Sequence, residues 1–331
     1  MNKADLIAQL ADGKFHSGSD LGQQLGVSRA AIWKAIQEMD KLGLEVHAVS
    51  GRGYRLHTPI SLLQAEAIKA FIPESCQQFI PTIDVLFEVD STNAYLMHLR
   101  EEQKISGRVC LAEFQQQGRG RRGREWVSPF GANIYLSLLW RFSEGTAKLS
   151  GLSLAVAVSL VKALEQLGIH GVGIKWPNDL LLNRRKLAGI LLELSGDPMG
   201  ACDVVCGIGL NVAMPPTASQ AIDQAWTDLR EAGLVQLDRN RLVGTLLGEL
   251  VRAFQTFERH GFGMFKDDWQ RYDLTAGQPI TLSMFQREIQ GIARGVDDAG
   301  MLLIEKADGM QRFASGEVSL RLRADGDEAP H

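Results

Sequence analysis

Glycine and arginine alternate from Gly118 to Trp126 in the run GRGRRGREW. Glycine lets a backbone approach a ligand closely, and each guanidinium offers a planar set of donors that suits phosphate or carboxylate. Polar, turn-forming residues flank the run, which favours a loop over a helix. We therefore expect an anion-binding loop, although charge alone leaves a solvated basic loop or a nucleic-acid patch equally open.

A second group of polar side chains interrupts two apolar segments, 174–182 and 184–194, which read as the strands of a hairpin with its turn at Asn183 and Arg184. Charges inside a protein are costly unless they are paired or used. At least one of these groups should therefore face a site. They are Lys175, Asn178, Asp179 and Lys186.

The third candidate is Asp90-Ser91-Thr92-Asn93, which follows an expected strand at 85–89 and precedes an amphipathic helix. Such residues cap helices, so capping alone would explain them. Hydroxyls at this junction could instead bind a polar ligand head. In the apolar strand expected at 204–211, Gly207 and Gly209 leave one face bare, so a ligand ring could lie against the backbone.

Several other elements must position these groups. We expect strands at 109–113 and 134–140, and a buried helix at 151–167. Helices are also expected at 220–233 and at 240–261, the latter capped by Asp238, with a loop at 215–217. After Gly277, short alternating segments at 280–284, 288–294, 301–305 and 310–314 suggest a small β-barrel.

The first sixty residues have a separate pattern. Three short helices, the third starting at Arg29 after the cap Ser28 and running to Leu42, precede a hairpin whose tip contains Arg52. This pattern predicts a winged helix-turn-helix. We favour DNA binding over protein docking. Because one such unit binds DNA weakly, we expect two copies to act together on an inverted repeat. The expected DNA-binding residues are Ser28, Arg29, Trp33, Lys34 and Arg52.

Length and composition limit the number of domains and the classes of function that fit the chain. The chain has 331 residues, which suggests two or three domains, and a net charge of −4, which argues against general coating of nucleic acid. Its four cysteines read as reduced, packed thiols, and we assign no residue as a metal ligand. No secretion signal or membrane span is evident in the sequence, so we predict a cytoplasmic protein that does not engage a membrane.

Taken in order, these motifs resemble the bifunctional biotin–protein ligase and biotin operon repressor family of bacteria. The resemblance rests on the helix-turn-helix, DSTN, QQxGRGRRGR, KWPND, RKLAGILxE and GxGxN, and it covers essentially the whole chain. It implies an α+β fold. The expected domains are a winged helix-turn-helix at 1–60, a class II synthetase-like catalytic domain with a mixed, helix-flanked sheet at 61–273, an SH3-like barrel at 274–323 and a disordered tail at 324–331.

The resemblance implies a two-step reaction. Biotin and Mg²⁺-ATP give biotinyl-5′-adenylate and pyrophosphate, and a lysine of the biotin carboxyl carrier protein then takes the biotin. Lys186, Arg121 and Asp179 would be catalytic. Biotin would contact Ser91, Thr92, Asn93, Gln115, Arg119, Gly120, Arg121, Lys186, Gly189 and Gly207. The nucleotide would contact Arg119, Arg121, Arg124, Trp126, Lys175, Asn178, Asn211 and Arg321, with Trp226 a further candidate to cover adenine or the valeryl chain.

The same resemblance implies a homodimer that forms when adenylate is bound and represses transcription at operator DNA. One departure is that Thr281 stands where well-known members carry a lysine. The alternatives are a ligase whose winged helix no longer binds DNA, a lipoate or octanoyl transferase, and a repressor without catalysis. The arginine loop and KWPND disfavour the transferase, and Lys186 with the loop arginines disfavours the non-catalytic repressor.

Overall fold

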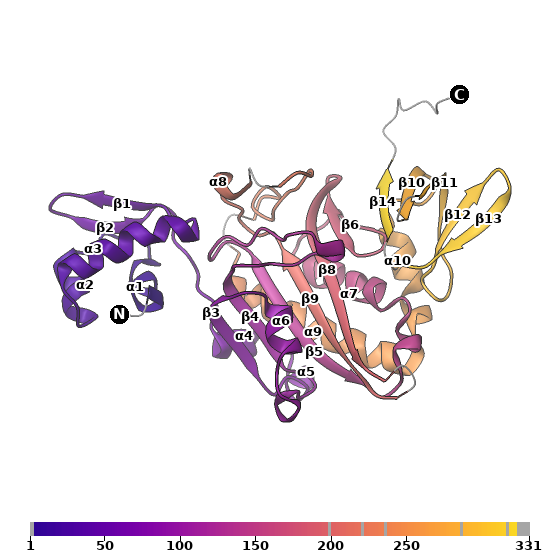
Figure 1. Cartoon of the computed structure of the whole chain (residues 1–331), viewed down its shortest axis with the longest axis horizontal. Coiled ribbons are helices and arrows are strands. Elements are labelled where there is room, and N and C mark those ends of the chain that lie inside the picture. Colours follow the sequence, from indigo (N-terminus) through magenta and orange to yellow (C-terminus); the bar gives the residue numbers. More distant parts are fainter. Residues whose placement is uncertain are drawn as a thin grey trace.

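The computed structural model describes residues 3–197, 200–219, 222–234, 237–284, 287–315 and 318–322. Three β-sheets organise these residues: a two-stranded hairpin, a seven-stranded mixed sheet and a five-stranded antiparallel sheet. Figure 1 shows the N-terminal hairpin and its helices at one end, the mixed sheet in the middle and the C-terminal strands at the other end. The predicted α+β fold is confirmed.

The N-terminal part has the predicted winged helix-turn-helix order. The Ser28 hydroxyl accepts a hydrogen bond from the Ala31 amide, as expected of a cap. The third helix is shorter than predicted, because its last turn tightens to a 3-10 helix that Gly43 ends in a left-handed conformation. The elements are α1 Lys3–Leu10, α2 Gly18–Gln24, α3 Arg29–Glu38, η1 Met39–Leu42, β1 Val46–Val49 and β2 Gly53–Leu56.

The central sheet has the strand order β3-β4-β5-β9-β8-β7-β6. Its first pair, β3 and β4, is parallel and every later pair is antiparallel, which makes it the mixed sheet predicted. The turn between β7 and β8 lies at Asn183 and Arg184, as expected. The strands are β3 Ile83–Val89, β4 Val109–Gln115, β5 Ile134–Phe142, β6 Val172–Lys175, β7 Asp179–Leu182, β8 Arg185–Gly196 and β9 Cys202–Leu210.

Two long helices, α7 and α9, pack on each other and on this sheet. In α7, eleven of the fifteen side chains are buried, in keeping with its apolar sequence, and Asp238 caps α9 through the Asn240 amide. Their apolar faces form the main core with the strands. The helical elements of this part are α4 Ala65–Phe71, α5 Glu74–Gln77, α6 Thr92–Met97, η2 Glu101–Gln103, η3 Arg121–Gly123, η4 Thr146–Leu149, α7 Leu152–Gln166, α8 Pro216–Ser219, α9 Arg239–His260, η5 Phe262–Phe265 and α10 Lys266–Tyr272.

The C-terminal sheet follows the predicted alternating segments. Its order is β13-β12-β11-β10-β14, so the last strand returns to pair with the first. The last strand, β14, was not predicted from the sequence, although Arg321, a candidate nucleotide contact, lies on it. Residues 324–331, expected as a disordered tail, lie outside the described residues. The strands are β10 Pro279–Met284, β11 Arg287–Val296, β12 Leu302–Lys306, β13 Gly309–Phe313 and β14 Val318–Leu322.

Two predictions between β9 and α9 are wrong. The helix predicted at 220–233 is absent from 222–233, the part of it that the structure describes, and residues 216–219 form the short helix α8 where only a loop was expected. The first error has a clear cause: the segment pairs with β8 instead, through hydrogen bonds from the Lys186 amide to the Ala225 carbonyl and from the Thr227 amide to the Lys186 carbonyl. Long-range pairing therefore overrides local helical preference.

A buried ion pair joins the winged helix's exit to the central sheet. Arg239 donates to Glu113 on β4 at 2.8 Å, and both side chains are about 5% exposed. Arg239 also donates to the Ser61 carbonyl, while the Glu113 carboxylate accepts from the Leu63 amide. The connection after the wing is thus anchored on β4. Among the described helices, none has the length and apolar character that a bilayer crossing requires.

Candidate active site

The arginine loop forms a narrow, closed turn beyond β4. The Trp126 amide donates to the Gly118 carbonyl, and the Gly120 amide donates to the Arg124 carbonyl, so the two arms of the loop run side by side. A Cβ at Gly118 would lie 2.3 Å from the Trp126 carbonyl oxygen, a contact that real side chains do not make. Glycine is therefore required at this position for the loop to close.

Arg121 ties the loop to two other parts of the molecule. Its guanidinium donates to Asn178 Oδ1 at 3.1 Å, and also to the Ser315 carbonyl of the C-terminal domain. Burial lowers the pKa of the Arg121 guanidinium, while the Asp179 carboxylate opposes that shift. Because an arginine side chain is not deprotonated in proteins, the group stays charged, and a partly buried cation attracts anions more strongly than an exposed one.

The residues after β3 combine capping with a polar network. Ser91 caps α6 by accepting a hydrogen bond from the Ala94 amide, so helix capping, the first of the two expected roles, is confirmed for that residue. Thr92 donates from its backbone amide to Gln115 Oε1 at 3.0 Å, and its hydroxyl lies 3.2 Å from the same oxygen. Asn93 Nδ2 donates to Glu193 Oε2 at 2.8 Å. The network fixes these side chains in one orientation and leaves few ways for them to move.

Two glycines of β9 make room for protein side chains. A Cβ at Gly207 would lie 2.2 Å from Asn93 Oδ1, and one at Gly209 would lie 2.3 Å from Trp126 Cε2. The bare strand face expected for a ligand ring is thus occupied at Gly209 by an indole of the protein itself. The Trp126 indole nitrogen is buried without a hydrogen-bond partner in the structure. Trp126 therefore forms part of the cavity wall and has a donor still to satisfy.

A β-bulge brings Lys186 to the site. Leu181 pairs with Lys186 while Leu180 pairs with Ala188, so β8 has one extra residue at this point. Strand side chains alternate between faces, and the extra residue moves Lys186 onto the face that carries Asp179 and Gly189. Lys186 Nζ then lies 2.9 Å from Asp179 Oδ1, with both side chains less than one-fifth exposed.

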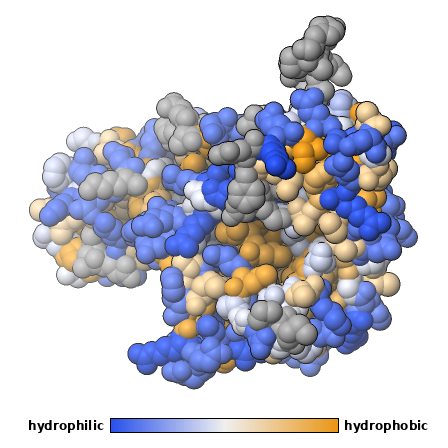
Figure 2. All heavy atoms as spheres, turned by 45° about the vertical axis from the view of Figure 1, so that its right-hand side comes forward, coloured by the Kyte–Doolittle hydropathy of each residue, from blue (hydrophilic) through white to orange (hydrophobic). Residues whose placement is uncertain are grey.

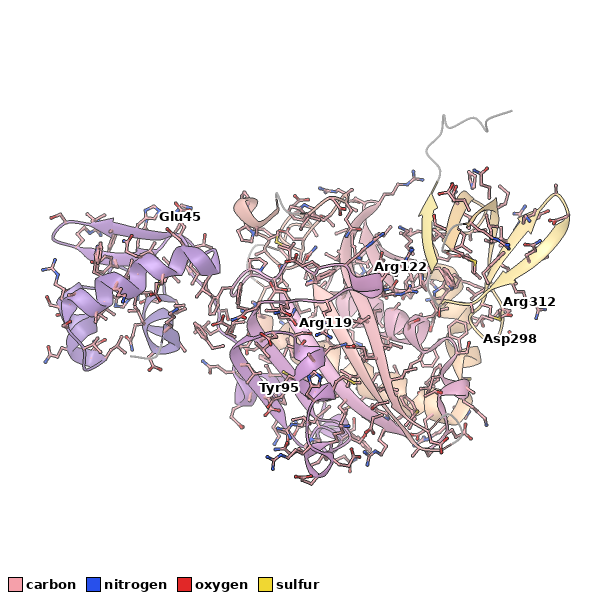
Figure 3. The ribbon with its side chains drawn as sticks, viewed as in Figure 1. Glu45, Tyr95, Arg119, Arg122, Asp298 and Arg312 are labelled. Atoms are coloured by element: carbon pink, nitrogen blue, oxygen red, sulfur yellow. The ribbon has the colours of Figure 1, made fainter. Side chains whose placement is uncertain are left out.

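These features meet around one cavity of about 350 Å³, a size typical of small-molecule sites. Figure 2 shows one face of the molecule on which apolar residues lie near the centre with hydrophilic residues around them. Figure 3 shows Arg119 and Arg122 on the loop above the central sheet, with Arg122 nearer the C-terminal strands. The predicted residues on the cavity wall are Ser91, Thr92, Asn93, Gln115, Arg119, Gly120, Arg121, Arg124, Trp126, Lys175, Asn178, Asp179, Lys186, Gly189, Gly207, Asn211 and Trp226.

Not every predicted residue sits equally deep. Arg119 and Arg124 are exposed and lie at the rim, whereas Arg121 is partly buried. The side chain of Arg321 lies outside the described residues, but its backbone pairs with Thr281 of β10. Thr281, the expected departure from the resemblance, therefore lies directly opposite Arg321.

Sequence reasoning missed three side chains that hold the site together. Ser137 on β5 lies 2.7 Å from Thr92 Oγ1 and 2.6 Å from Asn93 Oδ1. Ser128 accepts from Gln115 Nε2 and donates to the Trp126 carbonyl, which links the polar network to the base of the arginine loop. Glu193 on β8 orients Asn93. In the sequence, the one sign of such a role was that Ser137 interrupts the apolar run of β5.

The predicted DNA-binding residues are all exposed. Trp33 is 57% exposed, which is unusual for tryptophan, and Arg29 and Lys34 on α3 are also exposed, as is the cap Ser28. On the wing, Arg52 stacks over the Phe15 ring at 4.3 Å. Cations and an aromatic ring thus lie at the positions that a winged helix presents to DNA.

The cysteines match the prediction of packed thiols. All four, Cys76, Cys110, Cys202 and Cys206, are buried and free. Burial raises the pKa of the thiols of Cys110 and Cys206 strongly, so their thiolate forms are disfavoured. No cysteine is among the described residues that line the cavity.

Three family models match the chain. Residues 86–211 match the biotin/lipoate A/B protein ligase family, residues 2–55 an HTH domain, and residues 275–321 the biotin protein ligase C-terminal domain. Their order along the chain is that of the three sheets. The central match contains the Ser91 turn, the arginine loop and Lys186.

Named relatives extend the likeness over the whole chain. The bifunctional ligase/repressor BirA of Escherichia coli is 45% identical over 96% of both chains. The biotin–[acetyl-CoA-carboxylase] ligase of Paracoccus denitrificans is 35% identical and covers 71% of this chain and 98% of its own. A solved structure, the biotin protein ligase of Aquifex aeolicus in complex with biotin and ATP, matches 73% of this chain and all of its own at 29% identity, with a TM-score of 0.64.

The relatives that are named repressors as well as ligases align with almost the full length of this chain, winged helix included. The ligase in complex with biotin and ATP shares the fold that builds the cavity. The chain therefore belongs to the family of bifunctional biotin protein ligases and biotin operon repressors.

Proposed function

We propose that this protein uses ATP to convert biotin to biotinyl-5′-adenylate, with release of pyrophosphate, and then transfers biotin to a lysine of the biotin carboxyl carrier protein. The observation that carries the proposal is the single cavity where the Ser91 turn, the arginine loop and Lys186 meet. It is a biotin protein ligase, in line with its relatives. In the first step the biotin carboxylate attacks the α-phosphorus, a P–O bond forms, and pyrophosphate leaves.

The arrangement of charges fits that first step. A carboxylate and a phosphate repel each other, so a cation between them lowers the barrier. Lys186 offers a compact ammonium on a flexible stem, and Asp179 holds it in the cavity at 2.9 Å. Arg121 would hold the phosphates, with Arg119 and Arg124 at the rim. Lys175, Asn178 and Asn211 would contact the nucleotide, as would Arg321.

Biotin would lie on the other side of the cavity. Thr92 bonds Gln115 directly and is joined to Asn93 through Ser137, and each of the three has donors or acceptors that suit the ureido group. Ser91 lines the same wall. The Trp126 indole next to Lys186 would cover the ring or the acyl chain, and its unpaired nitrogen would find a partner there.

Magnesium would accompany ATP. Mg²⁺ is commonly held by one or two carboxylates together with substrate phosphates. The cavity wall includes the carboxylates of Asp179 and Glu125 close to the loop arginines, so the residues present fit such an ion. When bound, the ion would neutralise charge on the phosphates that leave as pyrophosphate.

In the second step the carrier's lysine amine attacks the acyl carbon, the acyl C–O bond to AMP breaks, and the amine loses a proton. Asp179 is our candidate to accept or orient that proton. The arginine loop would close over the adenylate and keep water away from the anhydride. Ser128 would transmit occupancy of the biotin network to the loop, because it bonds Gln115 and Trp126.

A second activity, repression of biotin synthesis genes, is favoured by the exposed surface of α3 and by the matched HTH domain. We propose that adenylate-bound protein dimerises and that two winged helices then bind an inverted repeat in the cytoplasm. Affinity for such DNA should rise when biotin and ATP are supplied together. Affinity that is indifferent to both ligands would leave a ligase without a sensing role.

Exchange of labelled pyrophosphate into ATP tests the adenylation step. It should require biotin, and lipoate should not replace it, because the ureido network at Thr92 and Gln115 would be left without its partner. Exchange with lipoate alone would identify a transferase of the lipoate class. Ligand binding without any exchange would instead indicate a repressor without catalysis.

A further inference from the structure

Three metal-ligating side chains meet at the open end of the wing, outside the active site. Glu45 precedes β1, His47 lies within β1, and His57 follows β2. The His57 amide donates to the Glu45 carbonyl at 2.8 Å, so these two residues continue the β1–β2 ladder by one pair. Because strand side chains alternate, Glu45 and His47 share a face, and His57 joins them from the opposite strand.

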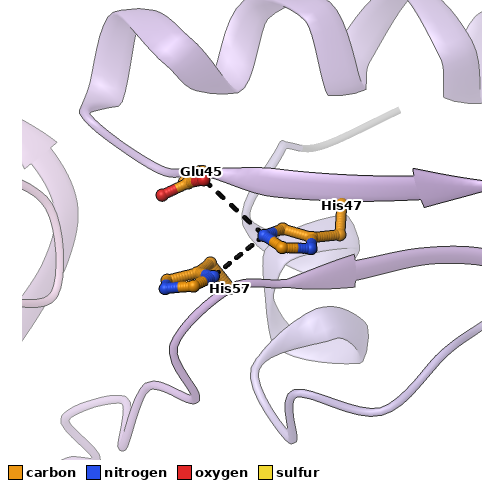
Figure 4. Close-up of side chains that lie close together, drawn as sticks. All are labelled: Glu45, His47 and His57. Atoms are coloured by element: carbon orange, nitrogen blue, oxygen red, sulfur yellow. Dashed lines mark hydrogen bonds and ion pairs between the residues drawn. The ribbon is translucent and has the colours of Figure 1, made fainter.

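The side chains are close enough to share one ion. His47 Nε2 lies 2.8 Å from His57 Nδ1 and 3.6 Å from Glu45 Oε1 (Figure 4). One ligand atom from each residue lies within 4.8 Å of the others. Within the described ranges, this is the single such group of three that the chain contains.

These separations approach those of a metal site. Ligands about 2.1 Å from a tetrahedral ion are roughly 3.4 Å from one another. The His47–Glu45 distance is already near that value, and the two imidazole nitrogens would move apart by about half an ångström. The movement is easy because the side chain of Glu45 is 72% exposed and that of His47 is 36% exposed. A hydrated ion can reach both groups for the same reason.

The donor set also indicates the kind of ion. Two imidazole nitrogens and one carboxylate oxygen suit zinc and neighbouring first-row ions far better than magnesium or calcium, which prefer oxygen alone. Arg55 stands opposite His47 in the register, but its guanidinium lies over the Phe15 ring at 5.1 Å. That cation is therefore engaged elsewhere.

We propose that Glu45, His47 and His57 bind one zinc ion, with water in the fourth position. The ion replaces the hydrogen bond between the two imidazoles, and each ring keeps its proton on the nitrogen that faces away from the metal. The ion links β1 to β2 at the end of the hairpin where the chain leaves the wing for residues 58–62. Bound zinc therefore stabilises the winged helix and holds its exit segment.

Calorimetric titration of the full chain with zinc chloride tests the site after treatment with a chelator. We expect one ion per chain, and at least a tenfold loss of affinity in His47→Gln and in His57→Gln, since even outer-shell changes weaken metal sites by that factor. His16→Gln is the matched control, because His16 in the same domain contacts a single carboxylate, Asp12, at 2.9 Å. It should bind zinc like the parent.

Thermal unfolding gives a second readout that does not depend on activity. Zinc should raise the unfolding temperature of the winged helix in the parent and in His16→Gln, and should leave that of His47→Gln and His57→Gln unchanged. Circular dichroism without zinc should show that all variants are folded. The proposal is overturned if the parent shows no saturable binding, or if both histidine variants bind zinc as tightly as the parent.

Discussion

Replacing Lys186 with methionine tests whether this lysine acts on the substrate or only neutralises Asp179. Methionine keeps the length of the stem and removes the charge. Lys186 Nζ lies 2.9 Å from Asp179 Oδ1, and both groups are mostly buried. Loss of one preorganised group that stabilises transition-state charge costs about 3–4 kcal/mol, roughly 10²–10³-fold in rate.

The double variant separates the two roles. If Lys186 serves the reaction, Lys186→Met should slow biotin-dependent pyrophosphate exchange by that factor, and Asp179→Asn added to it should give no recovery. If the lysine only neutralises Asp179, removing both charges should restore the rate to that of Asp179→Asn alone. Such recovery would refute the catalytic assignment. Lys162→Met, which breaks a half-exposed ion pair with Asp268, is the matched control and should leave exchange unchanged.

Three further predictions follow from other contacts. Glu113→Gln should lower the free energy of unfolding by about 3–5 kcal/mol in denaturant titration, because it leaves buried Arg239 uncompensated; a loss below about 1 kcal/mol would mean that the pair is dispensable. Arg121→Gly should release biotinyl-adenylate and label bystander lysines, detected by blotting for biotin, and undiminished retention of the adenylate would argue against that role. Gly207→Ala should weaken biotin binding in calorimetry, since the new methyl displaces Asn93; an unchanged Kd would show that the network tolerates the shift.

Local signals in the sequence predicted much of the fold correctly. Ser28 and Asp238 cap helices where expected, and the Asn183–Arg184 turn joins β7 to β8. These caps and turns depend on residues that are close together in the chain, so a short stretch of sequence is enough to predict them. Apolar runs likewise predicted the buried strands and α7.

Contacts between distant residues could not be predicted in the same way. The 222–233 segment pairs with β8 rather than forming a helix, and the bulge that turns Lys186 toward Asp179 depends on register across two strands. Ser137 joins the polar network of Thr92 and Asn93 from β5, forty-four residues from Asn93. No spacing rule links such residues, because only the assembled sheet brings them together.

The candidate site could be predicted in part from the sequence. Each motif had a possible chemical role, but each also had a simpler explanation when taken alone. Ser91 could be only a helix cap, and the arginine loop could be only a basic turn. The structure places both on one cavity with Lys186. What the sequence did not indicate is the connection between them, which runs through Gln115 and Ser128 to the carbonyl of Trp126.

Transfer to an acceptor tests the central claim most directly. The protein is incubated with biotin, ATP, Mg²⁺ and a biotin-accepting carrier domain, and the carrier is examined by mass spectrometry while released AMP is measured. We predict one biotinyl group on one lysine of each carrier domain, with one AMP formed per group transferred. A carrier that stays unmodified, or that accepts a lipoyl group when lipoate replaces biotin, would contradict the assignment of this cavity to biotin.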